Sequence, residues 1–245
     1  TVSCSKKQNY ELTSPDGSLQ MTFSQTEEGR ILYSFTTRGQ TLINPSPLGF
    51  RTESGETVLS GNWQIKSASY REVNQTWNPV WGKRKTVPEQ YKELSLSLTT
   101  NSVSSLTMVQ IIARAYNDGV AFRYIILPDQ KEPVNISGEL TGFHFAGDYT
   151  AWFYNGENQN IGPGKLSEYD GQFLPVMTVK TEKHYLAVHE AELIDGAPLV
   201  LSTKAGETLL SVASKEETLH PGYMSAWRVI LCGVTPGHLI DSHLI

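Results

Sequence analysis

The stretch that decides the fold runs from Val109 to Tyr124 and reads VQIIARAYNDGVAFRY. Apolar and polar residues roughly alternate as far as Tyr116, and after Asn-Asp-Gly the apolar residues return at every second position from Val120. Neighbouring side chains of a strand point to opposite faces, so two alternating runs around an Asp-Gly predict a central antiparallel β-hairpin. Because Asn, Asp and Gly tolerate positive φ, we also expect a primed turn at residues 117–119.

Alternating patterns recur along the whole chain. In the clearest one, Leu94, Leu96 and Leu98 alternate with Glu93, Ser95 and Ser97. This alternation predicts a strand with one buried face and one face in contact with water. No window holds an apolar stripe with helical spacing over three turns, so we expect no helix longer than about two turns. Many short strands separated by Gly and Pro predict an all-β fold, namely a large two-sheet antiparallel β-sandwich.

Composition narrows the possible partners. The net charge of -5 and the pI near 5.7 argue against a nucleic-acid partner, which requires a basic surface. No apolar run approaches the ~18 residues that a membrane-spanning helix needs. The two cysteines, Cys4 and Cys232, provide neither a disulfide framework nor metal-ligand spacing.

The first candidate site is the loop of Trp77 to Lys85, WNPVWGKRK. Two indole rings beside polar and cationic groups suit the apolar faces and hydroxyl groups of a sugar, which makes Trp77, Trp81, Lys83 and Arg84 candidate substrate-binding residues. The alternative is that both tryptophans plug one end of the sandwich while the cations remain solvated.

The second candidate site is the loop of Phe153 to Asn160, FYNGENQN. Its amide and carboxylate oxygens suit sugar hydroxyls, through Asn155 and Asn158, and are also the hard ligands that calcium prefers, through Glu157. The alternative is an ordinary polar surface loop.

Several segments, taken in order, carry a resemblance to the N-terminal β-domain of family 97 glycoside hydrolases. The phrase YNDGVAFRY resembles a recurring phrase of that family, and other segments follow in the family's order: LTSPDGSLQMTF from Leu12, PSPLGF from Pro45, TWNPVWGKRK from Thr76, QYKELSLSL from Gln90, FYNGENQNIGPGKLSE from Phe153, LAVHEAEL from Leu186 and AWRVILCG from Ala226.

This resemblance implies a sandwich of the galactose-mutarotase type, placed before a catalytic barrel in an α-glucosidase or α-galactosidase. It implies a loop at Trp77 that faces the active-site cleft, and a calcium ion that Glu157 shares with the barrel. The family's acid and base belong to the barrel, so no catalytic residue is expected here and the isolated chain should be inactive. The FYNGENQNIGP segment resembles the retaining, α-galactosidase-like branch.

The organisation that we expect is a flexible tether at residues 1–11 and one sandwich domain at 12–245, cut before a missing barrel. The apolar end, HLIDSHLI, suggests that cut. TVSC fits the end of a lipobox at Cys4, so we expect a periplasmic or outer-membrane-anchored lipoprotein of a Gram-negative bacterium. The expected partners are an α-linked oligosaccharide and the barrel of the same polypeptide; the alternatives are a free-standing carbohydrate-binding module and an interaction domain.

Overall fold

A computed structural model describes residues 9–82, 84–156 and 160–244. Within these residues the only helices are the short η1 (Leu166–Glu168) and α1 (Pro236–Asp241), and the rest of the regular structure is antiparallel strand. The all-β prediction and the limit on helix length are therefore confirmed.

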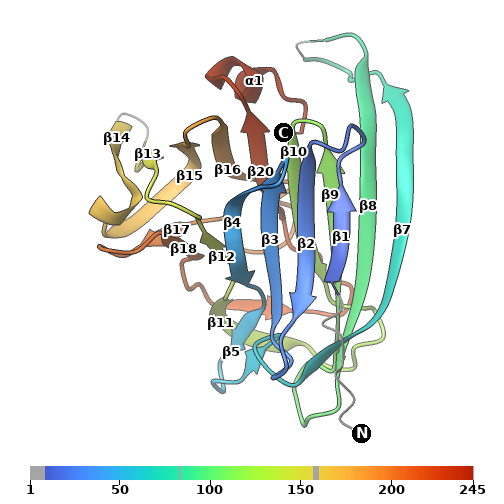
Figure 1. The fold of residues 1–245 in the computed structure, drawn as a ribbon. Coiled ribbons are helices and arrows are strands. Elements are labelled where there is room, and N and C mark those ends of the chain that lie inside the picture. The colour runs from blue at the N-terminus through green and yellow to red at the C-terminus, as the bar shows by residue number, and fades with distance from the viewer. Residues whose placement is uncertain (1–8, 83, 157–159, 245) are drawn as a thin grey trace, which may run out of the picture.

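Two antiparallel sheets form the sandwich, with the smaller one lying in front of the larger one in Figure 1. The four-stranded sheet contains β1 (Asn9–Thr13), β2 (Leu19–Gln25), β3 (Ile31–Thr37) and β4 (Gln40–Pro47) in that order. The twelve-stranded sheet has the order β12 (Gly142–His144), β18 (Leu209–Val212), β17 (Leu201–Thr203), β15 (Gly171–Lys180), β16 (Tyr185–Ala191), β20 (Trp227–Gly233), β10 (Gly119–Ile125), β9 (Met108–Tyr116), β8 (Val87–Thr100) and β7 (Trp63–Trp77), while β13 (Thr150–Tyr154) pairs with β14 (Asn160–Lys165) and β15.

A third, smaller sheet lies at the lower end of the sandwich in Figure 1. Its strands are β19 (Glu217–Leu219), β11 (Val134–Glu139), β5 (Phe50–Thr52) and β6 (Thr57–Val58). This sheet was not predicted from the sequence, because its short strands carry little periodic signal and β11 pairs with strands far along the chain.

The core lies between the two large faces, and aromatic residues dominate its centre. Phe122 of β10 packs against Tyr33 of β3 with ring centroids 4.9 Å apart, and against Phe23 of β2 at 6.5 Å. Leu94, Leu96 and Leu98 are fully buried, as their alternation predicted. Burial of apolar area at about 25 cal/mol per Å² is the main stabilising contribution of such a core.

The predicted central hairpin is confirmed, but its turn differs from the prediction. Strands β9 and β10 pair from Gln110 with Ile125 to Tyr116 with Gly119, which leaves Asn117 and Asp118 as the connection. None of Asn117, Asp118 and Gly119 has a positive φ, so the expectation of a primed turn is wrong. The glycine is needed for another reason: a Cβ at this position would lie 2.7 Å from the carbonyl oxygen of Ile230 on the neighbouring strand β20.

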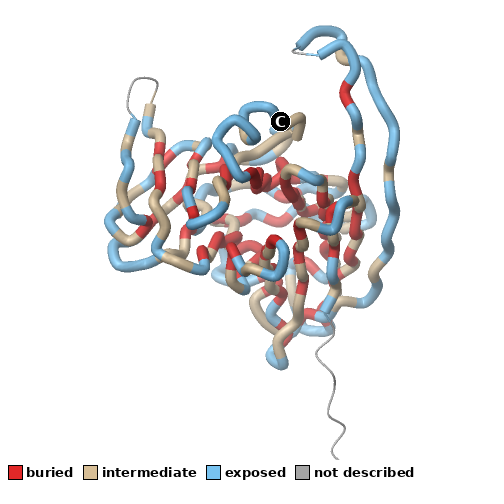
Figure 2. The backbone as a smooth tube through the Cα atoms, turned by 45° about the horizontal axis from the view of Figure 1, so that its top comes forward, coloured by how far each residue is buried: buried red, intermediate tan, exposed pale blue. Residues whose placement is uncertain are grey.

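The long hairpin of β7 and β8 projects beyond the sandwich, and Figure 2 shows its tip and most of β7 exposed. At the same end of the molecule, β13 and β14 rise on the other side, and α1 with the C-terminal residues lies between the two projections (Figures 1 and 2). The two loops selected from the sequence thus flank the C-terminal segment and do not form one site.

The C-terminal segment also departs from the strand-like alternation seen in its sequence. It forms α1, which begins at Pro236 and has Thr235 as its N-cap; the Thr235 hydroxyl accepts a hydrogen bond from the His238 amide. Both are favourable helix-start features. None of the helices in the described residues is long and apolar enough to cross a membrane.

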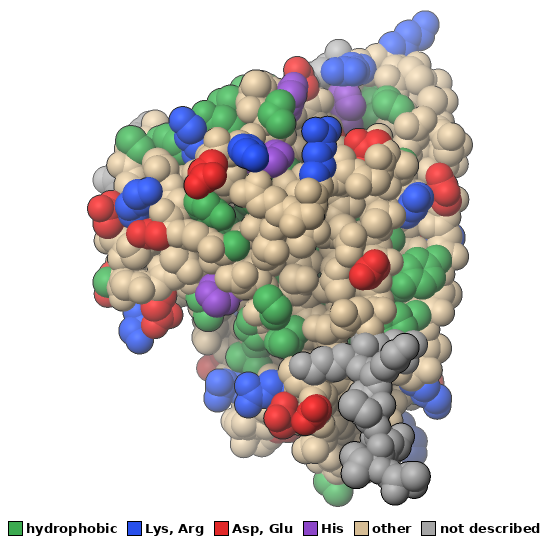
Figure 3. Space-filling model, viewed as in Figure 1, with side chains coloured by type: hydrophobic (Ala, Val, Ile, Leu, Met, Phe, Trp, Pro, Cys, Tyr) green, Lys and Arg blue, Asp and Glu red, His purple; other side chains and the backbone are tan. Residues whose placement is uncertain are grey.

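Charged side chains of both signs are interspersed on the face that Figure 3 shows. That face carries no continuous basic patch among the described residues, in agreement with the net charge of -5. It therefore lacks the basic footprint of a nucleic-acid interface.

Candidate functional site

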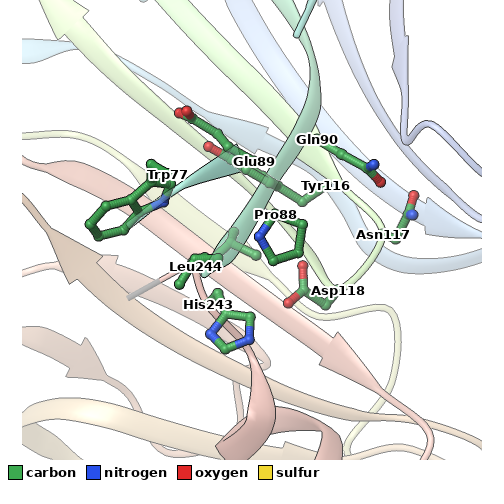
Figure 4. A pocket seen from close by; sticks show the side chains of 10 residues that line it. Trp77, Pro88, Glu89, Gln90, Tyr116, Asn117, Asp118, His243 and Leu244 are labelled. Atoms are coloured by element: carbon green, nitrogen blue, oxygen red, sulfur yellow. The ribbon is translucent and has the colours of Figure 1, made fainter. Parts of the chain in front are cut away.

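A hollow of about 520 Å³ lies where the projecting hairpin meets the body of the molecule (Figure 4). The end of the β7–β8 hairpin, the turn between β9 and β10, and the C-terminal segment line it together. The lining residues are Trp77, Val87, Pro88, Glu89, Gln90, Tyr116, Asn117, Asp118, His243 and Leu244. Of the residues predicted from the sequence, only Trp77 belongs to this set.

Strand pairing positions the hairpin wall of the hollow. Trp77 pairs with Val87 at the last position of the hairpin, and its indole is 49% exposed. Two and three residues before Trp77, side chains bond across the hairpin. The Gln75 amide donates to the Glu89 carboxylate at 2.5 Å, and the Gln90 amide donates to the Asn74 side chain at 2.9 Å. These cross-strand bonds hold the polar side chains of the wall in defined positions.

The turn of the central hairpin forms the floor of the hollow, and hydrogen bonds from two other segments hold it in place. The Asp16 amide donates to the Asn117 side chain at 3.0 Å, and the Ser242 hydroxyl donates to the Asp118 carboxylate at 2.7 Å. The buried Nε2 of His243 has no hydrogen-bond partner in the described residues. An indole face beside carboxylate, amide and imidazole groups is the chemistry with which proteins contact sugars or other polyhydroxylated ligands.

The tip of the hairpin is fully open to solvent. Trp81 is 89% exposed and Arg84 is exposed as well, while Thr86 donates to Asn78 across the loop at 2.9 Å. The proposal that both tryptophans plug the sandwich is therefore wrong, because neither indole enters the core. Lys83 lies outside the described residues.

The second candidate loop is described only in part. Asn155 follows β13 and is exposed, whereas Glu157 and Asn158 lie outside the described residues. Among the described residues no three His, Cys, Asp or Glu side chains gather as a metal site. A calcium ion held by this loop therefore stays a prediction.

Three glutamates with largely covered side chains were missed in the sequence, and arginines neutralise all three. Glu93 was assigned to a wet strand face, yet its side chain is 7% exposed because two arginines cover it. Arg71 donates to it at 2.5 and 2.9 Å, and Arg114 donates at 2.7 Å. Burial raises the pKa of the Glu93 carboxyl, and these arginine hydrogen bonds lower it further than burial raises it, so the pKa lies below its usual value.

The other two glutamates share one arginine in the interior. Arg228 of β20 lies 2.6 Å from Glu139 and 3.3 Å from Glu190. Burial lowers the pKa of Arg228, and the two carboxylates raise it more, to a net increase. Neither glutamate lines the hollow, and each is bound to a permanent cation, so this pair lacks the free carboxyl groups that glycoside hydrolysis requires.

An aromatic and cationic stack continues across the same sheet. The guanidinium groups of Arg114 and Arg123 lie over the Trp227 ring, at 4.7 and 4.5 Å from its centroid. Its indole N–H and Arg123 both donate to Glu192, at 2.9 and 3.0 Å. Because Trp227 is buried and two arginines contact its ring, it stabilises the sheet face and is not available for stacking on a sugar.

Comparison of this chain with known proteins identifies its family. The family model of the glycosyl-hydrolase 97 N-terminal domain matches residues 12–245. The chain is 25% identical over 229 residues to a retaining alpha-galactosidase of Bacteroides thetaiotaomicron, covering 86% of this chain and 33% of the relative. It is 23% identical over 216 residues to a probable retaining alpha-galactosidase of Streptomyces bingchenggensis, covering 84% of this chain and 32% of that protein.

Solved structures show the same fold. A glycoside hydrolase family 97 enzyme from Pseudoalteromonas sp. strain K8, solved with acarbose, matches with a TM-score of 0.85 at 23% identity, over 96% of this chain and 37% of that one. A beta-arabinopyranosidase matches with a TM-score of 0.78 at 20% identity, over 92% of this chain and 40% of that one. The chain spans about a third of the length of the curated relatives that it matches. Since the family model covers nearly the whole sequence, this chain belongs to the N-terminal domain family of the family 97 glycoside hydrolases.

Proposed function

We propose that this chain is the non-catalytic N-terminal domain of a calcium-dependent α-glycosidase, and that it shapes the active-site cleft of a catalytic barrel in the same polypeptide. The observation that carries the proposal is the family match over residues 12–245 together with relatives that are about three times as long. In those relatives the remaining two thirds would contain the catalytic machinery.

The proposed substrate is an α-linked oligosaccharide. The two curated relatives are named as retaining alpha-galactosidases, which makes an α-galactoside the first substrate to test. The Pseudoalteromonas enzyme was solved with acarbose and, as a variant, with panose, so an α-glucoside is the matched second substrate.

The contribution that we propose for this domain is a polar and aromatic wall for the sugar. Trp77 offers a half-exposed indole beside Glu89 at the outer end of β7, and Trp81 and Arg84 offer further exposed groups at the tip of the hairpin. Stacking of a ring on an apolar face contributes about 0.5–1.5 kcal/mol beyond area burial. Replacing a contacting tryptophan by alanine should therefore raise KM in the full enzyme by several-fold.

The experiment compares the 245-residue chain with the full-length polypeptide on nitrophenyl α-galactoside and nitrophenyl α-glucoside. We expect hydrolysis by the full-length polypeptide alone. Hydrolysis by the 245-residue chain that a single Asp or Glu substitution abolishes would show that the domain is itself catalytic and would overturn the proposal.

The proposed calcium site needs its own experiment. Calcium takes 6–8 oxygen ligands in flexible geometry, and one carboxylate cannot neutralise a divalent ion, so Glu157 would share the ion with acidic residues elsewhere in the polypeptide. Asn155 is exposed at the start of the loop, where an ion would be accessible. Activity of full-length Glu157→Gln should require more calcium after chelation than the wild type; an unchanged requirement would exclude Glu157 as a ligand.

A free-standing carbohydrate-binding module is the second candidate, and the exposure of Trp77 and Trp81 favours it. Calorimetric titration of the 245-residue chain with soluble α-linked oligosaccharides separates the two functions. A module binds sugar by itself and loses binding in Trp81→Ala, whereas a wall of a shared cleft binds measurably only in the full-length enzyme.

We also propose that the precursor is exported as a lipoprotein through Cys4, which lies outside the described residues. Incorporation of labelled palmitate into the wild-type precursor and its loss in Cys4→Ser test this proposal. Equal labelling of both would show that Cys4 carries no lipid.

A further inference from the structure

The two large sheets of the sandwich differ in width, and this difference leaves a ledge along one side of the molecule. Strand β1 is the edge of the four-stranded sheet, and it contacts β8 and β9 of the larger sheet. Strand β7 is the edge of the larger sheet, and Figure 1 shows it beyond β8 on the side of the molecule where β1 lies. The smaller sheet thus ends at β1, and the part of β7 beyond this edge stays open on the core side of the sheet.

A groove of about 260 Å³ lies on this ledge, and three strands line it. Its walls include Glu11 and Thr13 of β1, Tyr70 and Glu72 of β7, and Lys92 of β8. Tyr70 pairs with the fully buried Leu94 across the β7–β8 hairpin, so its ring points to the core side of the sheet, yet it is 57% exposed. A large aromatic ring that points inward and still meets water marks the place where the smaller sheet fails to cover the larger one.

The groove is separate from the hollow at the hairpin. The two share no lining residue. Tyr70 and Trp77 lie on the same strand, and at a rise of about 3.3 Å per residue they are roughly 23 Å apart along it. A ligand in the groove would therefore bind independently of one in the hairpin hollow.

Five polar side chains border the groove and are free to contact a ligand. Among the described residues, no hydrogen-bond or ion-pair partner exists for Glu11, Thr13, Tyr70, Glu72 or Lys92. Glu72 and Lys92 are directly opposite each other across the hairpin, and their opposite charges still form no ion pair. At the neighbouring position of the same hairpin, Arg71 donates to Glu93 at 2.5 and 2.9 Å, so that arginine is already engaged.

The chemistry of these groups matches a neutral sugar. An aromatic ring packs on the apolar CH face of a sugar, carboxylates accept hydrogen bonds from its hydroxyl groups, and an ammonium group donates to them. Partial burial, and then the nearby Tyr10 and Glu11, raise the pKa of the Tyr70 hydroxyl, which therefore remains protonated and can donate as well as accept. Two carboxylates beside one ammonium group give the groove a net negative charge, which disfavours sulfated or uronic-acid ligands.

Addition of a peptide strand to the open edge of β1 is the other way to fill such a ledge. Strand β1 has only five residues, and the exposed Glu11 is its central one. Short length and charged side chains are the features with which natural edge strands prevent the addition of another strand. The ledge therefore suits a sugar better than a peptide.

We propose that the groove between β1 and β7 is a second carbohydrate site, which binds neutral oligosaccharides by stacking a sugar ring on Tyr70 and by hydrogen bonds between sugar hydroxyl groups and Glu11, Glu72 and Lys92. The choice of α-linked sugars as test ligands rests on the proposed function, whereas the site follows from the groove itself. Such a site holds a longer sugar chain at a second point on the domain, which raises the local concentration of that chain.

Ligand-observed NMR titration of the 245-residue chain with panose and raffinose tests the proposal. Tyr70→Ala should weaken binding at least about fivefold, because it removes the stacking surface, and Tyr70→Phe should weaken it less because the ring remains. Glu72→Gln keeps the size of the side chain and should weaken binding about threefold. Glu53→Gln is its matched control, because Glu53 is exposed on the turn after β5 and lies outside the groove.

Three results would overturn the proposal. The first is that neither neutral trisaccharide binds, or that trigalacturonic acid binds as tightly as they do. The second is binding that Trp81→Ala abolishes and Tyr70→Ala leaves unchanged, which would assign the sugar to the hairpin tip. The third is a dimer in sedimentation that Tyr70→Ala dissociates, without sugar binding, which would assign the ledge to strand pairing between two copies.

Activity of the full-length polypeptide separates this inference from the proposed function. Hydrolysis of a nitrophenyl glycoside without Tyr70-dependent binding removes the second site and leaves the function standing. Tyr70-dependent binding without hydrolysis of either nitrophenyl glycoside leaves the second site standing and removes the glycosidase function.

Discussion

Replacement of Arg228 by methionine should destabilise the domain more than any other exchange of an arginine described above. The Arg228 side chain is 4% exposed, and it is the shared cation of Glu139 and Glu190, whose side chains are 9% and 12% exposed. Its Nη2 and Nε donate to the two oxygens of Glu139 at 2.6 and 3.2 Å, and its Nη1 donates to Glu190 at 3.3 Å. Methionine keeps an unbranched apolar stem and removes the charge and the donors together with the end of the guanidinium group.

The expected loss follows from the two carboxylates that remain. Removing one partner of a buried ion pair costs about 3–5 kcal/mol, because the other charge is left buried without compensation. Two glutamates lose their cation here, so the value should lie at the upper end of that range. The free energy of unfolding of a domain is about 5–15 kcal/mol, so this substitution should remove a large part of the stability.

Urea unfolding of the 245-residue chain, followed by far-UV circular dichroism, measures this loss. Arg71→Met is the matched control, because Arg71 is 59% exposed and Glu93 keeps Arg114 as a second partner. Exposed pairs contribute about 0–1 kcal/mol, so the control should change the unfolding free energy by no more than that. A loss below about 1 kcal/mol at neutral pH, equal to that of Arg71→Met, would refute the reasoning, since it would mean that water or relaxation already compensates the two carboxylates.

The remaining predictions concern single positions. The pKa of Glu93 is lowered in the folded state, so its contribution is present above the ordinary value near 4.5 and is lost as the pH falls through the lowered pKa; Glu93→Gln should be less stable than the wild type at neutral pH and equally stable at about pH 2, and a constant gap across that range would contradict this. Gly119→Ala should destabilise by about 2 kcal/mol or more in thermal unfolding, because its Cβ would lie 2.7 Å from the Ile230 carbonyl oxygen, whereas Gly61→Ala, with its nearest contact at 3.6 Å, should have little effect. Trp81→Ala should leave the unfolding free energy within about 0.5 kcal/mol, since the indole is 89% exposed, and a larger loss would show a structural role.

Local patterns predicted the strands well because burial on one sheet face imposes a period of two. Leu94, Leu96 and Leu98 are buried as their alternation required. The same pattern assigned Glu93 to water, and it could not show that arginines on both neighbouring strands cover that carboxylate. Periodicity specifies which way a side chain points, whereas its burial depends on the strands beside it.

The central hairpin shows the same limit at a turn. Asn117-Asp118-Gly119 located the reversal of the chain correctly, but the expected positive φ angles are absent. Glycine also occurs where another backbone approaches closely, and here that backbone is β20, far along the sequence. A local motif therefore predicted the position of the turn and gave the wrong physical reason for its glycine.

The hollow at the hairpin shows why the candidate site was only partly predictable. Trp77 was a candidate because tryptophans beside Asn, Pro, Gly and cations are unusual in a strand interior, and the family resemblance supplied its expected role. Asp118 and His243 carry no local signal, and they join Trp77 because β8 pairs with β9, β9 with β10, and β10 with β20, which brings the C-terminal segment beside the hairpin. Each pairing fixes one register, and an error of one residue in any of them would turn the side chains of that strand to the other face. The chemistry of this hollow thus depends on the topology of the whole sheet, and substitutions in the registers that join these strands should disturb the hollow even where they touch none of its lining residues.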